Sequence, residues 1–156
     1  MLPMMLDGFL RKLTSRQAEK NSSDPLQLAF AALLVEAARA DEDYSEKEAA
    51  IIDRALARKF SLDAGAAATL RAEAEAAQAR ATDVQRFTRI AKEMNAEEKI
   101  ALIEDLWSIV LADGSRDPFE DTLIRQICGL IYVDDKDSGA ARAQVAARLQ
   151  QNRTQP

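Results

Sequence analysis

Carboxylates gather in two short stretches of the sequence. Residues 36–48 hold six acidic and two basic side chains, a net charge of −4, and residues 113–121 hold four acidic and one basic, a net charge of −3. Together they are more negative than the whole chain, whose net charge is −5. Hard cations such as Ca²⁺ and Mg²⁺ prefer carboxylate and carbonyl oxygens, which suggests a divalent-cation site. It would not be an EF-hand, because position 12 counted from Asp41 is Ile52.

A purely structural interpretation accounts for part of the same pattern. Glu48 and Glu120 fall in the first turns of predicted helices, where carboxylates form capping boxes and favour the positive end of the helix dipole. Asp117 would be an N-cap. Asp41 and Asp113 fit this interpretation poorly, because they end their helices, where the dipole disfavours an anion.

The two acidic loops, residues 41–44 and 113–117, lie in an internal repeat with an offset of 72 residues. The identical pairs are Ala29/Ala101, Leu34/Leu106, Ala40/Ala112, Asp41/Asp113, Glu48/Glu120 and Ile52/Ile124. Each unit has an apolar helix, an acidic loop and a capped amphipathic helix. Packing around a pseudo-twofold axis would bring the two loops near each other.

Several classes of function are excluded by composition. The chain has no histidine, so Ser-His-Asp catalysis, Cys-His catalysis and imidazole-ligated metals are excluded. Its one cysteine, Cys128, cannot form an internal disulfide and is expected to be a small buried apolar side chain. The acidic net charge and the lack of a long basic run argue against nucleic acid as a partner.

The fold class follows from the helix-favouring composition. Alanine is abundant, whereas the 156 residues include only five glycines and four prolines. We expect an all-α, single-domain bundle of about seven to eight helices. The start signals are Asp24-Pro25, Ser45 with Glu48, Ser61, Thr82 with Gln85, Asn95 with Glu98, and Asp117-Pro118, followed by a last helix from about Ser138 to Leu149. Trp107 and Tyr132 are expected in the core, and Arg71 and Glu73 on a solvated helix face.

The N-terminal segment is expected to be a separate helix joined to the domain by a linker. Residues 1–20 are predicted to contain an amphipathic helix, residues 21–25 a linker, and residues 26–150 the helical domain. The apolar face of the first helix could pack on the domain, dock a partner or lie on a membrane surface. No apolar stretch approaches the roughly 20 residues that span a bilayer, and we expect a cytoplasmic protein.

The two loops and the helices around them resemble the TerB family, the tellurite-resistance protein B-like group of bacterial proteins. The resemblance rests on Ala112-Asp113-Gly114 with Glu120, and on Ala40-Asp41 with Glu48, and it extends over about Leu26 to Leu149. The sequence departs from a symmetrical arrangement where Glu42 stands opposite Gly114.

This resemblance implies an all-helical cytoplasmic protein that is not an enzyme. It implies a link to resistance to tellurite and other stresses, and to complexes with an integral membrane partner. The implied metal site would use Asp41, Glu48, Asp113 and Glu120, assisted by Asp43 and Asp117, with Ca²⁺ or Mg²⁺ preferred over Zn²⁺.

Three hypotheses for function follow. The first is a non-enzymatic TerB-like protein whose acidic loops bind a divalent cation or a partner protein. The second is a metal-dependent hydrolase, which would also need a general base and a substrate cleft. The third is a structural adaptor whose acids only cap helices.

Overall fold

The computed structural model of the protein describes residues 24–40, 44–112 and 118–154. These residues form seven helices and no strand, which confirms the all-α fold class. The helices are α2 (Pro25–Arg39), α3 (Glu46–Phe60), α4 (Ala64–Arg80), α5 (Gln85–Ala91), α6 (Ala96–Ala112), α7 (Pro118–Ile131) and α8 (Asp135–Thr154). The predicted helix within residues 1–20 lies outside the described residues.

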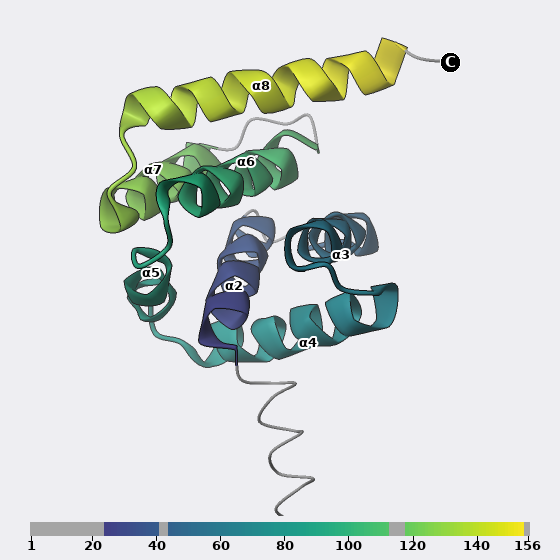
Figure 1. Cartoon of the computed structure of the whole chain (residues 1–156), viewed down its shortest axis with the longest axis vertical. Helices are drawn as coiled ribbons and strands as arrows, with labels where there is room; N and C mark the ends of the chain where they lie inside the picture. The colour runs from purple at the N-terminus through teal and green to yellow at the C-terminus, as the bar shows by residue number, and fades with distance from the viewer. Residues whose placement is uncertain (1–23, 41–43, 113–117, 155–156) are drawn as a thin grey trace, which may run out of the picture.

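Helix α2 occupies the centre of the molecule. It packs against α3, α4, α5, α6 and α7 (Figure 1). Its seven consecutive residues from Ala29 to Val35 are at most 1% exposed, so it is buried on nearly every side. The rings of Phe30 and Phe60 of α3 form a T-shaped pair at a centroid distance of 5.3 Å. An apolar helix without a polar face is stable only inside such a shell.

The outer helices cover opposite sides of this centre. Helix α4 packs against α2 and α3, and α6 packs between α2 and α8. Figure 1 shows α8 lying across α6, on the opposite side of the molecule from α4. Helices α2–α4 and α6–α8 are two successive sets of three helices. In each set, the residue that follows the second helix, α3 or α7, has a positive φ. The internal duplication itself stays a prediction.

Four of the predicted helix starts are confirmed, because α7 begins at Pro118 and three others show the predicted capping hydrogen bonds. The Asp24 side chain accepts hydrogen bonds from the backbone N–H groups of Leu26 and Gln27 at 3.0 and 3.2 Å. Ser45 Oγ accepts from the Glu48 N–H at 3.3 Å. Asn95 and Glu98 form a reciprocal capping box, with bonds of 2.8 and 3.4 Å.

Ser61 ends a helix instead of opening one, so that prediction was wrong. Ser61 is left-handed, with φ 53°, and the N–H of Leu62 returns to the Ala57 carbonyl at 3.0 Å. Helix α4 is capped by Asp63, whose Oδ1 accepts from the Ala66 N–H at 2.7 Å. Serine occurs at either end of a helix, and Asp63, an equally good N-cap two residues later, marks the start of α4.

Two further boundaries differ from the prediction. Thr82 does not cap α5; the side chain of Asp83 instead accepts from the Gln85 N–H at 2.9 Å. Helix α8 extends beyond Ser138–Leu149 at both ends. Its first turn closes when the Ser138 N–H bonds the Asp134 carbonyl at 3.0 Å, and polar residues with adequate helix propensity extend its last turn.

The predicted core is correct except at one aromatic residue. Trp107 is 7% exposed and Cys128 is 1% exposed, as expected. Tyr132 is 78% exposed and has φ 63°, so its prediction as a core residue was wrong. It ends α7, and the Val133 N–H returns to the Cys128 carbonyl at 2.9 Å. The left-handed backbone turns the Tyr132 side chain away from the apolar face.

Candidate functional site

Two of the six predicted metal ligands lie in the described part of the chain. Glu48 is the third residue of α3 and is 7% exposed; Glu120 is the third residue of α7 and is 3% exposed. The others lie outside the described residues: Asp41, Asp43, Asp113 and Asp117. A buried carboxylate is costly without partners, and the helix N-terminus partly offsets that cost. Both the capping and the ligand interpretations are compatible with these positions.

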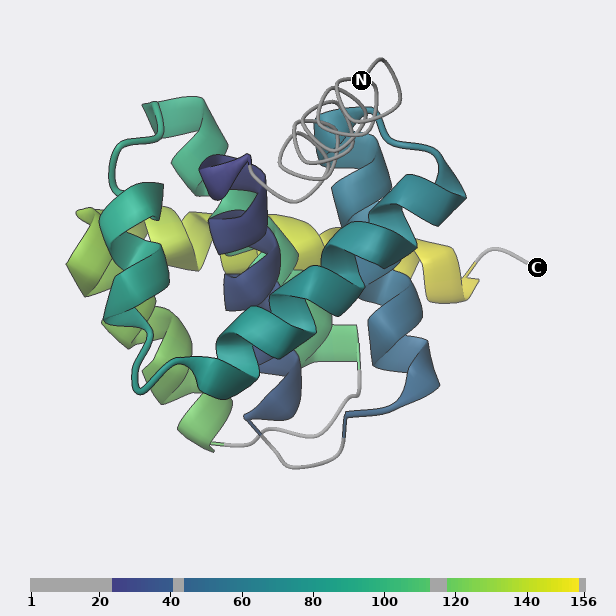
Figure 2. The same cartoon turned by 90° about the horizontal axis from the view of Figure 1, so that it is seen from below.

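The helix ends that flank the two acidic loops lie on one side of the molecule. Figure 2 shows the last turns of α2 and α6 and the first turns of α3 and α7 toward its lower side. A site that draws ligands from both loops requires this arrangement. Within residues 24–40, 44–112 and 118–154, no group of three Asp, Glu, Cys or His side chains could hold a metal ion. The predicted site therefore depends on the four acids outside them.

A polar network joins the end of α2 to α4 beside the first acidic loop. Arg39 donates to the Glu75 carbonyl at 3.2 Å and to Gln78 Oε1 at 2.5 Å. Gln78 Nε2 donates to Glu36 at 2.6 Å. The Arg39 guanidinium also lies 5.3 Å from the ring centroid of Tyr44. Because Arg39 precedes residues 41–43 and Tyr44 follows them closely, these contacts hold together the two helix ends that the loop connects.

Arg71 extends this network to α3. Its Nε donates to Asp53 at 2.6 Å, and its guanidinium pairs with Glu75 one turn along α4. The hydrogen bond to Asp53 is the main reason that the pKa of Arg71 is raised. The pKa of Tyr44 is raised too, chiefly by burial and then by the charge of Glu75. The prediction of a solvated face is wrong for Arg71, which is 22% exposed and joins two helices.

Asp105 is a buried acid that was not predicted from the sequence. It lies on α6 with its side chain 7% exposed, and Arg58 of α3 donates to it at 2.8 Å. Burial raises the pKa of Asp105 to about 6, against the lowering effect of Arg58. The available signal was helical spacing, because Asp105 lies three residues after Leu102 and four before Ile109, on the apolar face of α6.

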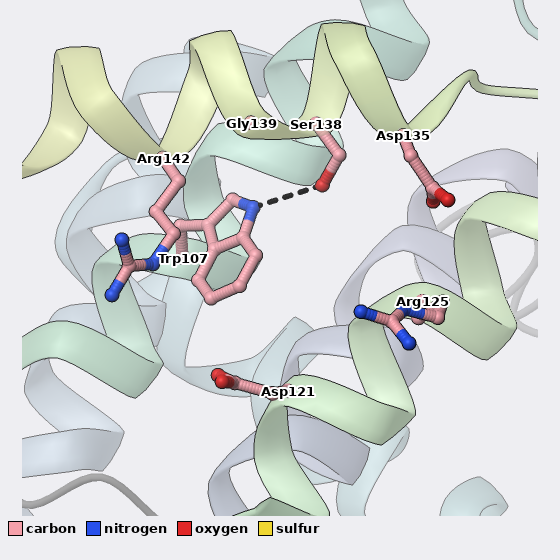
Figure 3. A pocket seen from close by; sticks show the side chains of 7 residues that line it. All are labelled: Trp107, Asp121, Arg125, Asp135, Ser138, Gly139 and Arg142. Atoms are coloured by element: carbon pink, nitrogen blue, oxygen red, sulfur yellow. Dashed lines mark hydrogen bonds between the residues drawn. The ribbon is translucent and has the colours of Figure 1, made fainter.

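A second group of polar residues lines a pocket between α6, α7 and α8, and it includes none of the six predicted metal ligands. The pocket has a volume of about 310 Å³. It is lined by Trp107 of α6 and by the charged side chains of Asp121, Arg125, Asp135 and Arg142 (Figure 3). These residues are spread over three helices and 36 positions. Only the packing of the helices brings them together.

The comparison with known families decides what kind of chain this is. The family described as "Tellurite resistance protein TerB" matches residues 27–143. The chain belongs to the TerB family. No curated protein and no solved structure gave a match.

This match confirms the family resemblance seen in the two acidic loops, and the matched residues make up most of the chain. TerB is associated with tellurite resistance and is generally not an enzyme family. Among the described residues of this TerB-family chain, no helix is long and apolar enough to cross a membrane.

Proposed function

We propose that this TerB-family chain is a non-enzymatic protein of tellurite and stress resistance that binds a divalent cation, Ca²⁺ or Mg²⁺, between its two acidic loops. The observation that carries the proposal is the gathering of four helix ends on one side, with Glu48 and Glu120 buried in two of them (Figure 2). The family match supports the resistance role.

The ligands would be oxygen atoms from both halves of the chain. Asp41 and Glu48 would come from the first loop and Asp113 and Glu120 from the second, with Asp43 and Asp117 assisting. Such an all-oxygen donor set suits a hard cation that takes six to eight oxygens, and the absence of histidine from the sequence makes Zn²⁺ a poorer choice. A bound cation would also offset the repulsion between carboxylates.

The proposal is tested by thermal unfolding of chelator-treated protein with and without millimolar Ca²⁺, Mg²⁺ or Zn²⁺. A ligand that binds only the folded state at one hundred times its Kd stabilises it by about 2.7 kcal/mol. We expect Ca²⁺ or Mg²⁺ to raise the melting temperature of the wild type. The increase should disappear in Asp113→Asn and Glu120→Gln and persist in Glu46→Gln, an exposed acid in the first turn of α3.

Two results would count against this function. If no cation shifts the wild type, the loops do not bind metal tightly, and a basic partner surface or helix capping would account for the acids. If the shift persists in both loop variants, a cation binds elsewhere.

The cellular setting belongs to the same proposal. The domain of residues 26–150 works in the cytoplasm with a protein partner at the membrane, reached through that partner or through residues 1–20. Liposome co-sedimentation of the full chain and of a chain lacking residues 1–20 tests the direct route. Equal sedimentation of both would eliminate the N-terminal segment as a membrane anchor.

A further inference from the structure

The pocket between α6, α7 and α8 has an aromatic wall and four charged side chains. Figure 3 shows Trp107 of α6 at its centre, with Arg142 of α8 on one side and Asp121 of α7 below. Arg125 of α7 and Asp135 of α8 lie on the other side. Acidic and basic groups therefore alternate around the indole, and none of the six predicted metal ligands lines the pocket.

The indole is fixed before any ligand arrives. Its Nε1 donates to Ser138 Oγ at 3.1 Å, and both side chains are buried. The Arg142 guanidinium lies 5.4 Å from the ring centroid, within the range of a cation–π interaction. A rigid aromatic wall lowers the entropic cost of binding a small molecule.

The charged groups are available for a ligand. Within the described part of the chain, Asp121, Arg125, Asp135 and Arg142 form no ion pair within 4.0 Å, with one another or with other residues. What is particular to the pocket is the placement of these charges, because two acids and two bases from α7 and α8 surround one indole ring.

We propose that this pocket binds a small zwitterion of the α-amino acid class. A simple anion would be attracted by the two arginines but repelled by the two aspartates. A simple cation would be attracted by the aspartates but repelled by the arginines. A molecule carrying both an ammonium and a carboxylate group satisfies both signs at once, and each charge-assisted hydrogen bond is stronger than a neutral one. The volume of about 310 Å³ admits an amino acid or a dipeptide.

The test uses the intrinsic fluorescence of Trp107, which is the single tryptophan of the chain. Chelator-treated full-length protein is titrated with each common α-amino acid and with glycylglycine, and binding is checked by calorimetry. Ethylamine and acetate, at the same ionic strength, serve as ligands with one charge each. We expect a saturable change with at least one zwitterion and none with the single-charge compounds.

Two pocket variants and two matched controls locate the site. Arg125→Gln and Asp135→Asn should each weaken binding about tenfold or more, because each removes a charged hydrogen-bonding group from an accessible position. Arg89→Gln on α5 and Asp137→Asn on α8 remove the same charges from exposed positions outside the pocket and should leave binding unchanged.

Three results would overturn the proposal. These are no saturable binding by any zwitterion, equal binding of acetate or ethylamine, and equal loss in the control variants. Circular dichroism on each variant separates loss of binding from loss of fold. Because the protein is free of metal, this outcome is independent of cation binding at the acidic loops.

Discussion

Burial raises the pKa of the Asp105 carboxyl group, so this side chain takes up a proton at a higher pH than an exposed aspartate. Its pKa is raised to about 6 from an ordinary value of 3.8, although Arg58 lies 2.8 Å away. Arg58 is 68% exposed, so water screens its charge and it offsets only part of the desolvation. The folded protein therefore binds a proton at Asp105 in a pH range where the unfolded chain has released it.

The sign of the resulting pH dependence follows directly. A group with a raised folded pKa contributes stability below its unfolded pKa, and this contribution is lost as pH rises through about 6. We predict that the free energy of unfolding of Asp105→Asn, relative to that of the wild type, increases by on the order of 2 kcal/mol between pH 4 and pH 7. Urea unfolding at several pH values measures this difference.

Loss of the Arg58 bond shifts the Asp105→Asn variant by a constant amount, so only the change with pH is diagnostic. Exposed Asp137→Asn controls for the loss of one negative charge. A difference between wild type and Asp105→Asn that stays flat from pH 4 to pH 7 would contradict the prediction.

At the scale of single residues, apolar neighbours in the sequence predicted burial, but the sequence did not predict contacts between helices. The apolar neighbours of Cys128 and Trp107 correctly predicted burial, because neighbours on a buried helix face share its environment. The same argument failed for Tyr132, since a positive φ at the end of α7 changes the direction of its side chain. The role of Arg71 depends on Asp53, which lies on another helix, and no local pattern contains that pairing.

At the scale of elements, the ends of α3 and α7 carry left-handed residues that are not glycine. Tyr132 has φ 63° and is 78% exposed, so its backbone is strained while its side chain packs little. We predict that Tyr132→Gly stabilises the protein by roughly 0.5–1 kcal/mol, because glycine adopts this conformation without the steric cost. Thermal and urea unfolding measure the gain.

A matched alanine variant separates backbone from side chain. Tyr132→Ala keeps the left-handed strain and should show no gain. Marked destabilisation of Tyr132→Gly would instead restore the interpretation of Tyr132 as a core residue.

The contact between α3 and α4 depends on the shape of the Arg71 side chain. The guanidinium reaches Asp53 and Glu75 at once, and all three groups are only partly exposed. We predict that Arg71→Lys costs about 1 kcal/mol, because a point-like ammonium cannot reproduce both bonds. Double-mutant cycles with Asp53→Asn provide the measurement, and a coupling energy near zero would show that the pair is only a surface contact.

At the scale of the whole molecule, composition and capping signals predicted an all-α fold but not its packing. Asp24, Ser45 and Asn95 mark helix starts through local hydrogen bonds, and these are written in short sequence patterns. The pairing of α6 with α8 rests on a helix whose sequence is weakly amphipathic, so periodicity could not locate its partner. For the same reason the pocket around Trp107 could not be predicted.

Helix α2 joins two halves of the molecule into one unit: α3 and α4 form one half, and α5, α6 and α7 belong to the other. It contacts α3 and α4 on one side and α5, α6 and α7 on the other, so neither half keeps its core alone. We predict a single cooperative unfolding transition, in which the calorimetric and van't Hoff enthalpies agree. Leu34→Ala, at a side chain with 0% exposure in α2, should destabilise that one transition by about 3 kcal/mol without splitting it.

Leu149→Ala in α8, at a half-buried position beside the core, is the matched control for Leu34→Ala and should cost less. Two calorimetric transitions, of which Leu34→Ala lowers only one, would mean that the halves fold independently. The shared burial of α2 argues for one transition, because removing either half would expose its apolar surface to water.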